Sequence, residues 1–103
     1  SDIRLKKNVK NIQNALDKML KLRGVTYQWK NPQEHGNMTG TYMSMVAQEV
    51  EEIFPEWIGT DSKGYKTLGF IGFEALTAES IKELKRQIDV LTARIEALEA
   101  KTQ

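Results

Sequence analysis

The amino-terminal segment carries the two side chains best suited to covalent chemistry, Ser1 and Lys6. A serine hydroxyl is a weak nucleophile until a base removes its proton, and a lysine that desolvation keeps neutral can act as that base without a histidine. With one histidine and no cysteine in the chain, Ser1 with Lys6 is the nucleophile pair that this terminus offers. Because the sequence opens on serine and not on methionine, we expect a chain released by self-cleavage immediately before Ser1. The alternative is that Ser1 is an arbitrary start of the chain.

For Lys6 to act as the base, it has to be buried, and the backbone has to bring it close to Ser1. A free lysine has a pKa of about 10.4, so that roughly one in a thousand is neutral at pH 7, and burial has to lower this pKa before a lysine acts as a base. Residues five positions apart point to opposite faces of a strand and lie about 140° apart around a helix. Neither element brings Ser1 and Lys6 together, so we expect a turn, a bulge or a neighbouring chain to do so.

Composition predicts one small domain with a further element appended. The 103 residues are 40% hydrophobic and carry a net charge of +1. A chain of this length builds one modest core and buries roughly two-thirds of its unfolded surface, and its near-neutral charge favours neither nucleic acid nor an anionic membrane as a partner. The absence of cysteine excludes disulfides and thiolate metal sites. No apolar run approaches the ~20 residues of a membrane span, and we expect no cofactor, no signal peptide and a cytoplasmic setting.

The carboxy-terminal third has the periodicity of a coiled coil. Apolar residues recur at spacings of three and four, with isoleucine at every a position and leucine at every d position of the heptad. This seam consists of Ile81, Leu84, Ile88, Leu91, Ile95 and Leu98. It predicts an oligomerisation helix, in which Arg94 at g and Glu99 at the following e form an interchain ion pair that sets the register. On the outer face, Glu83 and Arg86 are spaced to pair within the helix.

An alternative for this segment is an amphipathic helix that packs on its own domain. The seam spans only three heptads, and isolated helices of this length are marginal in water. The predicted helix therefore needs partner chains or a globular base to be stable.

Upstream of the seam, the pattern is mixed α and β. A helix is predicted over residues 12–23, with Asn11 as its N-cap and Gly24 as its stop. Period-two alternation predicts strands over residues 25–29 and 42–46. The other expected elements are turns over 31–40, a short helix over 48–54 that Pro55 ends, and a hairpin of 57–58 with 65–70 around the turn 61–64.

These elements place the chain in the α+β class. Residues 1–70 are expected to form a small mixed globular domain, and residues 71–103 a long C-terminal coiled-coil helix.

Other candidate sites are better explained by simpler interpretations. His35, beside Glu34 in a turn-rich segment, has no further ligands at metal-binding spacing, which favours an exposed loop histidine. The acidic residues around helix 48–54 surround an apolar set expected in the core, Val50, Ile53 and Phe54, so a solvated face is favoured over catalytic carboxylates. These acidic residues are Glu49, Glu51, Glu52 and Glu56.

The basic residues near the amino terminus and the large aromatic residues also have simpler explanations than a binding site. The basic residues Arg4, Lys6, Lys7 and Lys10 lack an accompanying base-reading element, which argues against a nucleic-acid interface. The large aromatic residues are expected to pack in the core or between subunits and not to form a ligand cage. They are Tyr27, Trp29, Tyr42 and Trp57.

Five segments, in order along nearly the whole chain, resemble a known family. They are Ser1-Asp2-x-Arg4-x-Lys6-x-Asn8-Val9, Leu16 to Leu22, Val25 to Lys30, Ala47 to Glu56, and Ile81 to Leu84. Together they look like the C-terminal intramolecular chaperone domain of phage tail spikes and tail fibres, the S74 peptidase family. In that family the domain trimerises a β-rich fibre, assists its folding and cuts itself off before a serine, using that serine and a lysine five residues later. The resemblance implies that Ser1 and Lys6 hold these roles.

The resemblance also implies partners and a setting. The partners would be two further copies in a parallel homotrimer and the upstream fibre or spike segment of the same precursor, in the host cell cytoplasm during virion assembly, with release from the mature fibre. Isoleucine at a with leucine at d favours parallel dimers in isolated coiled coils. We nevertheless expect a trimeric coiled coil, because phage fibres are threefold and the globular part can set the stoichiometry over three short heptads.

Two other functions compete with the self-cleaving chaperone. One is a non-catalytic coiled-coil trimerisation module of a fibrous protein, which needs only the seam. The other is a coiled-coil domain of a transcription factor, since relatives of the family occur as releasing domains in membrane-tethered regulators.

Overall fold

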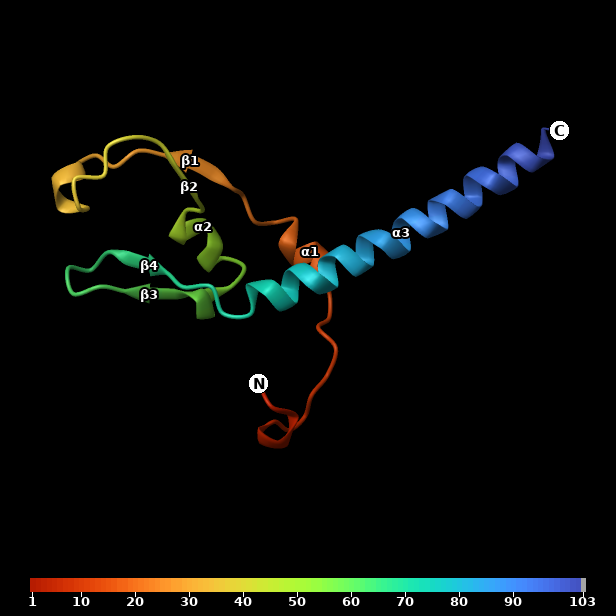
Figure 1. Ribbon diagram of the computed structural model, residues 1–103, viewed down its shortest axis with the longest axis horizontal. Helices are drawn as coiled ribbons and strands as arrows, with labels where there is room; N and C mark the ends of the chain where they lie inside the picture. Colours follow the sequence, from red (N-terminus) through yellow and green to blue (C-terminus); the bar gives the residue numbers. More distant parts are fainter. Residues whose placement is uncertain (103) are drawn as a thin grey trace. The chain divides into compact units, whose positions relative to one another are not determined.

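Helix α3, Phe73–Lys101, is the longest element of the computed structural model, which describes residues 1–102 (Figure 1). It contains every position of the seam, so the predicted C-terminal helix is confirmed. The helix starts two residues later than predicted, because Gly72 before it has a left-handed backbone with φ +79°. The predicted pair on its outer face is present, with 2.6 Å between Arg86 Nη2 and Glu83 Oε2.

Helices and strands both occur, which confirms the α+β class, and they form two units. One unit combines residues 1–19 with residues 72–102, and the other is formed by residues 20–71. Helix α3 thus groups with the amino-terminal segment, whereas the sequence pattern places it after a globular domain of residues 1–70. The units reflect contacts inside one chain, and the division into functional domains after residue 70 stays a prediction.

Helix α1, Ala15–Met19, packs against α3 in the first unit (Figure 1). Ala15 and Leu16 of α1 are buried, as are Leu76 and Ser80 of α3. The Ser80 hydroxyl donates a hydrogen bond of 2.7 Å to the Leu76 carbonyl, so this buried polar group is satisfied. The contact joins an early segment of the sequence to the C-terminal helix.

The helix predicted over residues 12–23 is wrong at both ends. Asn14 has φ +57°, a left-handed backbone that an α-helix does not include, so the helix begins one residue after it. Downstream, Leu20 is 71% exposed and has no packing to support a further turn. Since short helices are stable only where tertiary packing supports them, α1 is confined to the segment that lies on α3. Neither predicted cap, Asn11 or Gly24, adjoins it.

In the second unit, strands β1 (Val25–Tyr27) and β2 (Tyr42–Ser44) pair antiparallel. Val25 lies opposite Ser44, and Tyr27 lies opposite Tyr42. Side chains along β1 alternate between half-buried and exposed, as the period-two pattern predicts. Both strands are shorter than predicted, and a 3-10 helix that the sequence pattern did not indicate, η2 (Pro32–Glu34), lies in the turn-rich segment between them.

The predicted hairpin is confirmed by strands β3 (Ile58–Thr60) and β4 (Lys66–Leu68), which pair antiparallel. Asp61 shapes its turn, because Oδ1 accepts the backbone N–H groups of Lys63 and Tyr65 at 2.9 Å each.

The core of the second unit lies around helix α2 (Ala47–Glu51) and the 3-10 helix η3 (Pro55–Trp57). Val50 is 1% exposed, and the buried rings of Phe54 and Trp57 stack with centroids 4.1 Å apart. The predicted helix over 48–54 therefore ends earlier, and Pro55 starts η3, a first-turn position where its missing N–H costs no helical hydrogen bond.

Leu76→Ala is expected to destabilise the first unit by about 2–5 kcal/mol, because it removes most of a buried side chain and leaves a cavity in its place. Leu76 is 4% exposed. Urea unfolding followed by circular dichroism measures the change in the free energy of unfolding. The control is Leu20→Ala, the same change at a side chain that is 71% exposed, where we expect a loss within about 0.5 kcal/mol. Equal effects of the two substitutions would contradict the burial of Leu76.

Candidate functional site

A short 3-10 helix, η1, lies between the two side chains predicted to do the chemistry. It spans Ile3–Leu5, with Asp2 as its N-cap and Lys6 as its C-cap. Its two backbone hydrogen bonds measure 3.0 and 3.1 Å. The chain therefore contains a turn between Ser1 and Lys6, which is one of the features that their spacing requires.

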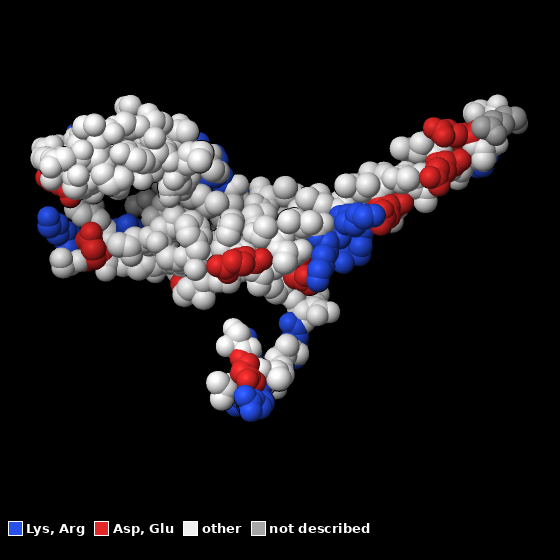
Figure 2. Space-filling view, in the orientation of Figure 1, with Lys and Arg blue, Asp and Glu red and all other residues white. Residues whose placement is uncertain are grey.

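The Asp2 carboxylate and the Arg4 guanidinium meet across this turn. Asp2 Oδ1 accepts the backbone N–H of Arg4 at 2.8 Å, which is the N-cap hydrogen bond. Arg4 Nε donates to both carboxylate oxygens at 3.1 and 3.2 Å, and Arg4 Nη2 donates to Oδ2 at 2.8 Å. Figure 2 shows an acidic and a basic group in contact on this segment. The side-chain hydrogen bonds, and then the backbone one, hold the pKa of the Asp2 carboxyl below its ordinary value.

This pair was not predicted, because the sequence pattern placed Arg4 in a basic run and in the motif of the resemblance without indicating a contact with Asp2. The signal that would have found it is an aspartate two residues before the backbone N–H that it caps, a spacing that favours a local side-chain turn.

Ser1 and Lys6 themselves are exposed. Among residues 1–102, neither the Ser1 hydroxyl nor the Lys6 ammonium has a hydrogen bond or an ion pair, and the two do not bond to each other. No residue of η1 is buried. A single chain thus leaves both groups in water, and the desolvation that a lysine base requires is not supplied within it.

The seam on α3 is uncovered in its own unit. Its six residues are 44% to 62% exposed. The row of α3 that faces α1 is a different one: Ser80 is buried in it, and Glu83 and Gln87 line a groove with α1. Each of these three residues precedes a seam residue by one position, which is about 100° around the helix. An apolar stripe of this length that its own unit leaves exposed is typical of an interaction surface.

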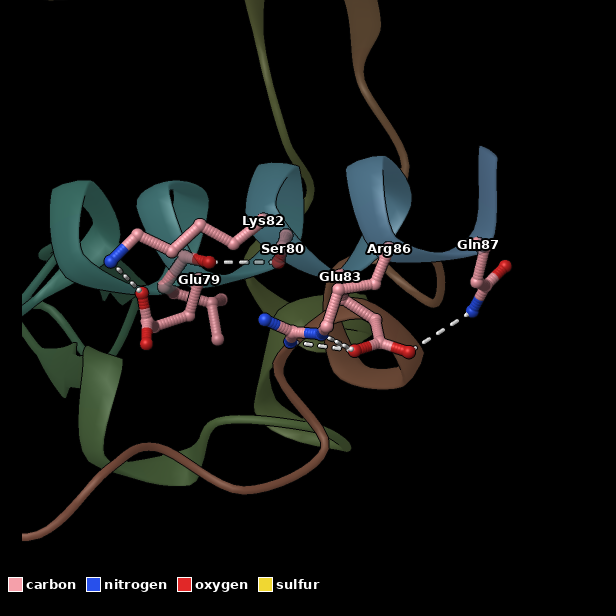
Figure 3. A network of polar contacts seen from close by, with 7 residues as sticks. Glu79, Ser80, Lys82, Glu83, Arg86 and Gln87 are labelled. Atoms are coloured by element: carbon pink, nitrogen blue, oxygen red, sulfur yellow. Dashed lines mark hydrogen bonds and ion pairs between the residues drawn. The ribbon is translucent and has the colours of Figure 1, made fainter. Parts of the chain in front are cut away.

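Charged side chains near the amino-terminal half of α3 pair within the helix. The ion pairs are Lys82–Glu79 at 3.2 Å, Lys85–Asp89 at 2.5 Å and Arg86–Glu83 at 2.6 Å, two of which appear in Figure 3. By contrast, Arg94 and Glu99 make no ion pair among residues 1–102. The two residues predicted to pair between chains therefore have no competing partner in the part of their own chain that the structure describes.

A polar groove lies between α1 and α3, lined by residues 12–17 on one side and by four residues of α3 on the other. Those of α3 are Glu79, Glu83, Arg86 and Gln87 (Figure 3). Glu83 accepts hydrogen bonds from Arg86 and Gln87, and these bonds, that of Arg86 foremost, lower the pKa of its carboxyl. The carboxylates of α3 that line the groove are thus already engaged. Within the described part of the chain, no three His, Cys, Asp or Glu side chains are grouped to hold a metal ion.

His35 lies on the aromatic cluster of the second unit. It is exposed, as predicted, and its ring stacks on that of Trp29 with centroids 3.6 Å apart and an angle of 9° between the planes. Trp29 meets Tyr27 edge-on at 5.1 Å, and Tyr27 contacts Tyr42 at 6.0 Å. Of the four aromatic residues expected in the core or between subunits, Trp57 is buried in the core, whereas these three are half-buried and pack on one another.

Two of the four acidic residues around α2, Glu49 and Glu51, have ion-pair partners. Arg23 Nη2 lies 2.6 Å from Glu49 Oε2, and Lys66 pairs with Glu51. The Arg23 hydrogen bonds lower the pKa of the Glu49 carboxyl. This arrangement is an ion-paired surface and does not place two carboxylates for acid and base chemistry. As for membranes, none of the helices formed by residues 1–102 has the length and apolar character of a transmembrane span.

Comparison with known proteins gives one family and several relatives. Residues 1–59 match the Peptidase_S74 family, described as the chaperone of endosialidase. The chain is 41% identical over 103 residues to the long tail fiber protein Gp37 of Enterobacteria phage K3, an alignment that covers 98% of this chain and 8% of that protein. The protein of the same name from Enterobacteria phage T2 is also 41% identical, with 98% of this chain and 7% of that protein covered.

A third relative, Gp37 of Escherichia phage AR1, is 36% identical over 87 residues, which is 81% of this chain and 8% of that protein. The chain thus spans less than a tenth of the length of these relatives. The family match includes Ser1, η1 and Lys6 and continues through α1, strands β1 and β2, α2 and η3. It covers more than half of the chain, and the likeness to tail fibre proteins extends over most of it. The chain therefore belongs to the Peptidase_S74 family, the chaperones of endosialidase.

Proposed function

We propose that this chain is the intramolecular chaperone of a phage tail fibre or spike, which trimerises, assists the folding of the segment before it and then cuts the precursor immediately before Ser1. The observation that carries this proposal is the family match over residues 1–59, which includes Ser1 and Lys6 at the spacing expected of nucleophile and base. The names of the relatives support a tail fibre as the folding client. The process would take place in the host cell cytoplasm during virion assembly, without a cofactor.

The proposed cleavage needs only groups of the chain and one water molecule. In the precursor, Ser1 Oγ attacks the carbonyl carbon of the preceding residue while Lys6 Nζ accepts the hydroxyl proton. The bond from that carbon to the Ser1 nitrogen then breaks, and Lys6 returns the proton to this nitrogen, which leaves the upstream chain as an ester on Oγ. Water hydrolyses the ester and frees an upstream carboxylate and the serine hydroxyl. Because Oγ attacks a group bonded to its own residue, most of the entropic barrier of a bimolecular step is absent.

Assembly is proposed to complete the site. Ser1 and Lys6 are exposed in the single chain, and a lysine acts as a base at neutral pH only after it is desolvated. A neighbouring copy or the folded fibre segment would supply this desolvation. Cleavage would then act as a check on assembly, because only a correctly trimerised fibre sheds its chaperone.

The proposal of a trimer rests on the uncovered seam together with the unpaired charges beside it. Burial of six apolar side chains per chain favours association, and Arg94 and Glu99 are free to pair between chains at the g and e positions. Sedimentation equilibrium of the chain measures the stoichiometry. A dimer would overturn the threefold assignment.

A second candidate function is a trimerisation module without chemistry, which the seam alone would support. The two functions differ in one measurement. When the chain is expressed together with its upstream segment, a self-cleaving chaperone yields two bands on a denaturing gel, and a trimerisation module without catalytic activity yields one.

Lys6→Arg in the same precursor is expected to block cleavage, by about 10²-fold or more, since general-base catalysis contributes typically 10²–10⁴-fold and a guanidinium stays protonated at neutral pH. The rate of appearance of the released band measures the effect. Lys10→Arg is the matched control, as it makes the same change on the same exposed segment outside η1. Normal processing of the Lys6 variant would exclude Lys6 as the base.

A further inference from the structure

We propose that Asp2 and Arg4 are positioning residues, whose ion pair holds the η1 turn and thereby sets the separation of Ser1 from Lys6. The inference rests on the proposed function, because it assigns a task in the same cleavage reaction. Asp2 follows the nucleophile directly and is the N-cap of η1, whereas the base is its C-cap. The residues between Ser1 and Lys6 are therefore all part of the turn or its N-cap.

The geometry of the pair suits this task. Four hydrogen bonds run from Arg4 to the Asp2 carboxylate, one from the backbone and three from the guanidinium. The backbone bond fixes the start of the turn, and the planar guanidinium fixes the direction in which the carboxylate points. Nε and Nη2 together engage both carboxylate oxygens, so the contact is directional and not merely a point-charge attraction.

Nothing else among residues 1–102 holds the turn in place. Residues 1–14 are all exposed, and η1 has no buried residue. A three-residue 3-10 helix has poor hydrogen-bond geometry, and a single helical turn is costly to form without outside support. Since the two backbone hydrogen bonds of η1 cannot stabilise it alone, the Asp2–Arg4 pair decides how much of the time the turn is formed.

The pair has a second consequence for the base. The Asp2 carboxylate is engaged by Arg4 and is therefore not available to Lys6, which has no ion pair among residues 1–102. A carboxylate released from Arg4 would be free to pair with the Lys6 ammonium on the same turn. An ammonium held by a carboxylate is stabilised in its charged form and is a poor base.

The test uses the precursor with its upstream segment and measures the first-order rate of cleavage. Asp2→Ala removes both the cap and the ion pair, and we expect a loss of about 10- to 100-fold, since a misplacement of about 1 Å can cost 10²-fold. Asp2→Asn keeps a capping oxygen and should cleave faster than Asp2→Ala. Lys10→Ala, which removes a charge from the same exposed segment outside η1, should cleave at the wild-type rate.

A second comparison tests the consequence for Lys6, namely that a carboxylate released from Arg4 pairs with the ammonium. Arg4→Ala should slow cleavage because it releases the Asp2 carboxylate, and adding Asp2→Asn to this variant should restore part of the rate. If the pair acts only by holding the turn, the double variant should be no faster than Arg4→Ala, since it has lost more contacts. Trimer content, measured by sedimentation, should be the same for all of these variants.

Each outcome decides between the inference and the proposed function. Cleavage of Asp2→Ala or Arg4→Ala at the wild-type rate overturns the inference, whereas a double variant no faster than Arg4→Ala alone contradicts the capture of Lys6 by the released carboxylate. Ser1→Ala is measured in parallel. If it still cleaves at the same bond, the proposed function fails; if it is inactive while Asp2→Ala is normal, only the positioning role fails.

Discussion

Ser1→Ala, in a precursor that carries the upstream segment, should stop cleavage while the chain still folds and assembles. Loss of the nucleophile of a serine protease costs about 10⁶-fold in kcat, and we expect a loss here of at least about 10³-fold. Folding should be intact because Ser1 is exposed and its hydroxyl has no partner among residues 1–102. The expected product is an uncleaved fibre with a folded chaperone attached, seen as one band on a denaturing gel.

Ser62→Ala provides the matched control for this change. Ser62 is also exposed, and it lies in the turn between β3 and β4, away from η1 in the sequence. Ser62→Ala also removes a serine hydroxyl, but at a residue with no proposed role in the reaction, so cleavage should be normal. If the Ser1 variant splits at the original bond, Ser1 is not the nucleophile and the mechanism proposed above is wrong.

Replacing Ile88 and Leu91 with Asp should dissociate the proposed trimer and stop the proposed cleavage together. Both residues lie in the middle of the seam and are 56% and 55% exposed in the single chain, so the substitutions leave the isolated fold little affected. In the assembly each carboxylate would be buried without a partner, at about 3–5 kcal/mol apiece. With tenfold in affinity for every 1.4 kcal/mol, association should weaken by at least about 10⁴-fold. Analytical ultracentrifugation and the rate of cleavage are measured on the same samples.

The control for charge alone is the pair of substitutions Ala93→Asp and Ala100→Asp. Both positions fall at f of the heptad, on the side of α3 opposite the seam, and both are exposed. The charge change per chain is identical, so the control should remain trimeric and cleave normally. In the seam variant, trimer content, cleavage and correct folding of the upstream segment should recover together as protein concentration rises. Wild-type cleavage by demonstrably monomeric protein would place the complete site within one chain.

Ser1 and Lys6 are exposed in the single chain, and so is the seam. A single chain provides the residues and a turn between them, but it provides neither burial for Lys6 nor cover for the seam. If one event supplies both, namely the association of three copies on a fibre, chemistry and assembly are coupled without any additional regulatory element.

Those elements whose stability comes from local interactions could be predicted from the sequence. The hairpin around residues 61–64 follows from a polar turn in which Asp61 caps two backbone N–H groups, and α3 follows from a heptad pattern sustained over three repeats. In both, each residue interacts with neighbours a few positions away, so the pattern of side chains is sufficient.

The bounds of the short helices could not be predicted in this way. Helix α1 is limited by the left-handed backbone at Asn14 and by the extent of its contact with α3, more than 50 residues later in the sequence. A five-residue helix has little stability of its own. Its length is therefore decided by a distant partner that no local pattern reveals.

The sequence by itself determined which residues are candidates for the chemistry, Ser1 and Lys6, and which apolar row is available for association, because residue type and spacing alone limit both choices. Only the tertiary structure decided that α1 covers the neighbouring row of α3 and leaves the seam exposed. The ion pair in the turn at η1 is a different case, because Asp2 and Arg4 lie only two positions apart and the spacing of the aspartate is a signal that the sequence itself carries. The reason is physical: which face of a helix is buried depends on contacts between segments that lie far apart in the chain, and no local pattern of side chains reveals them.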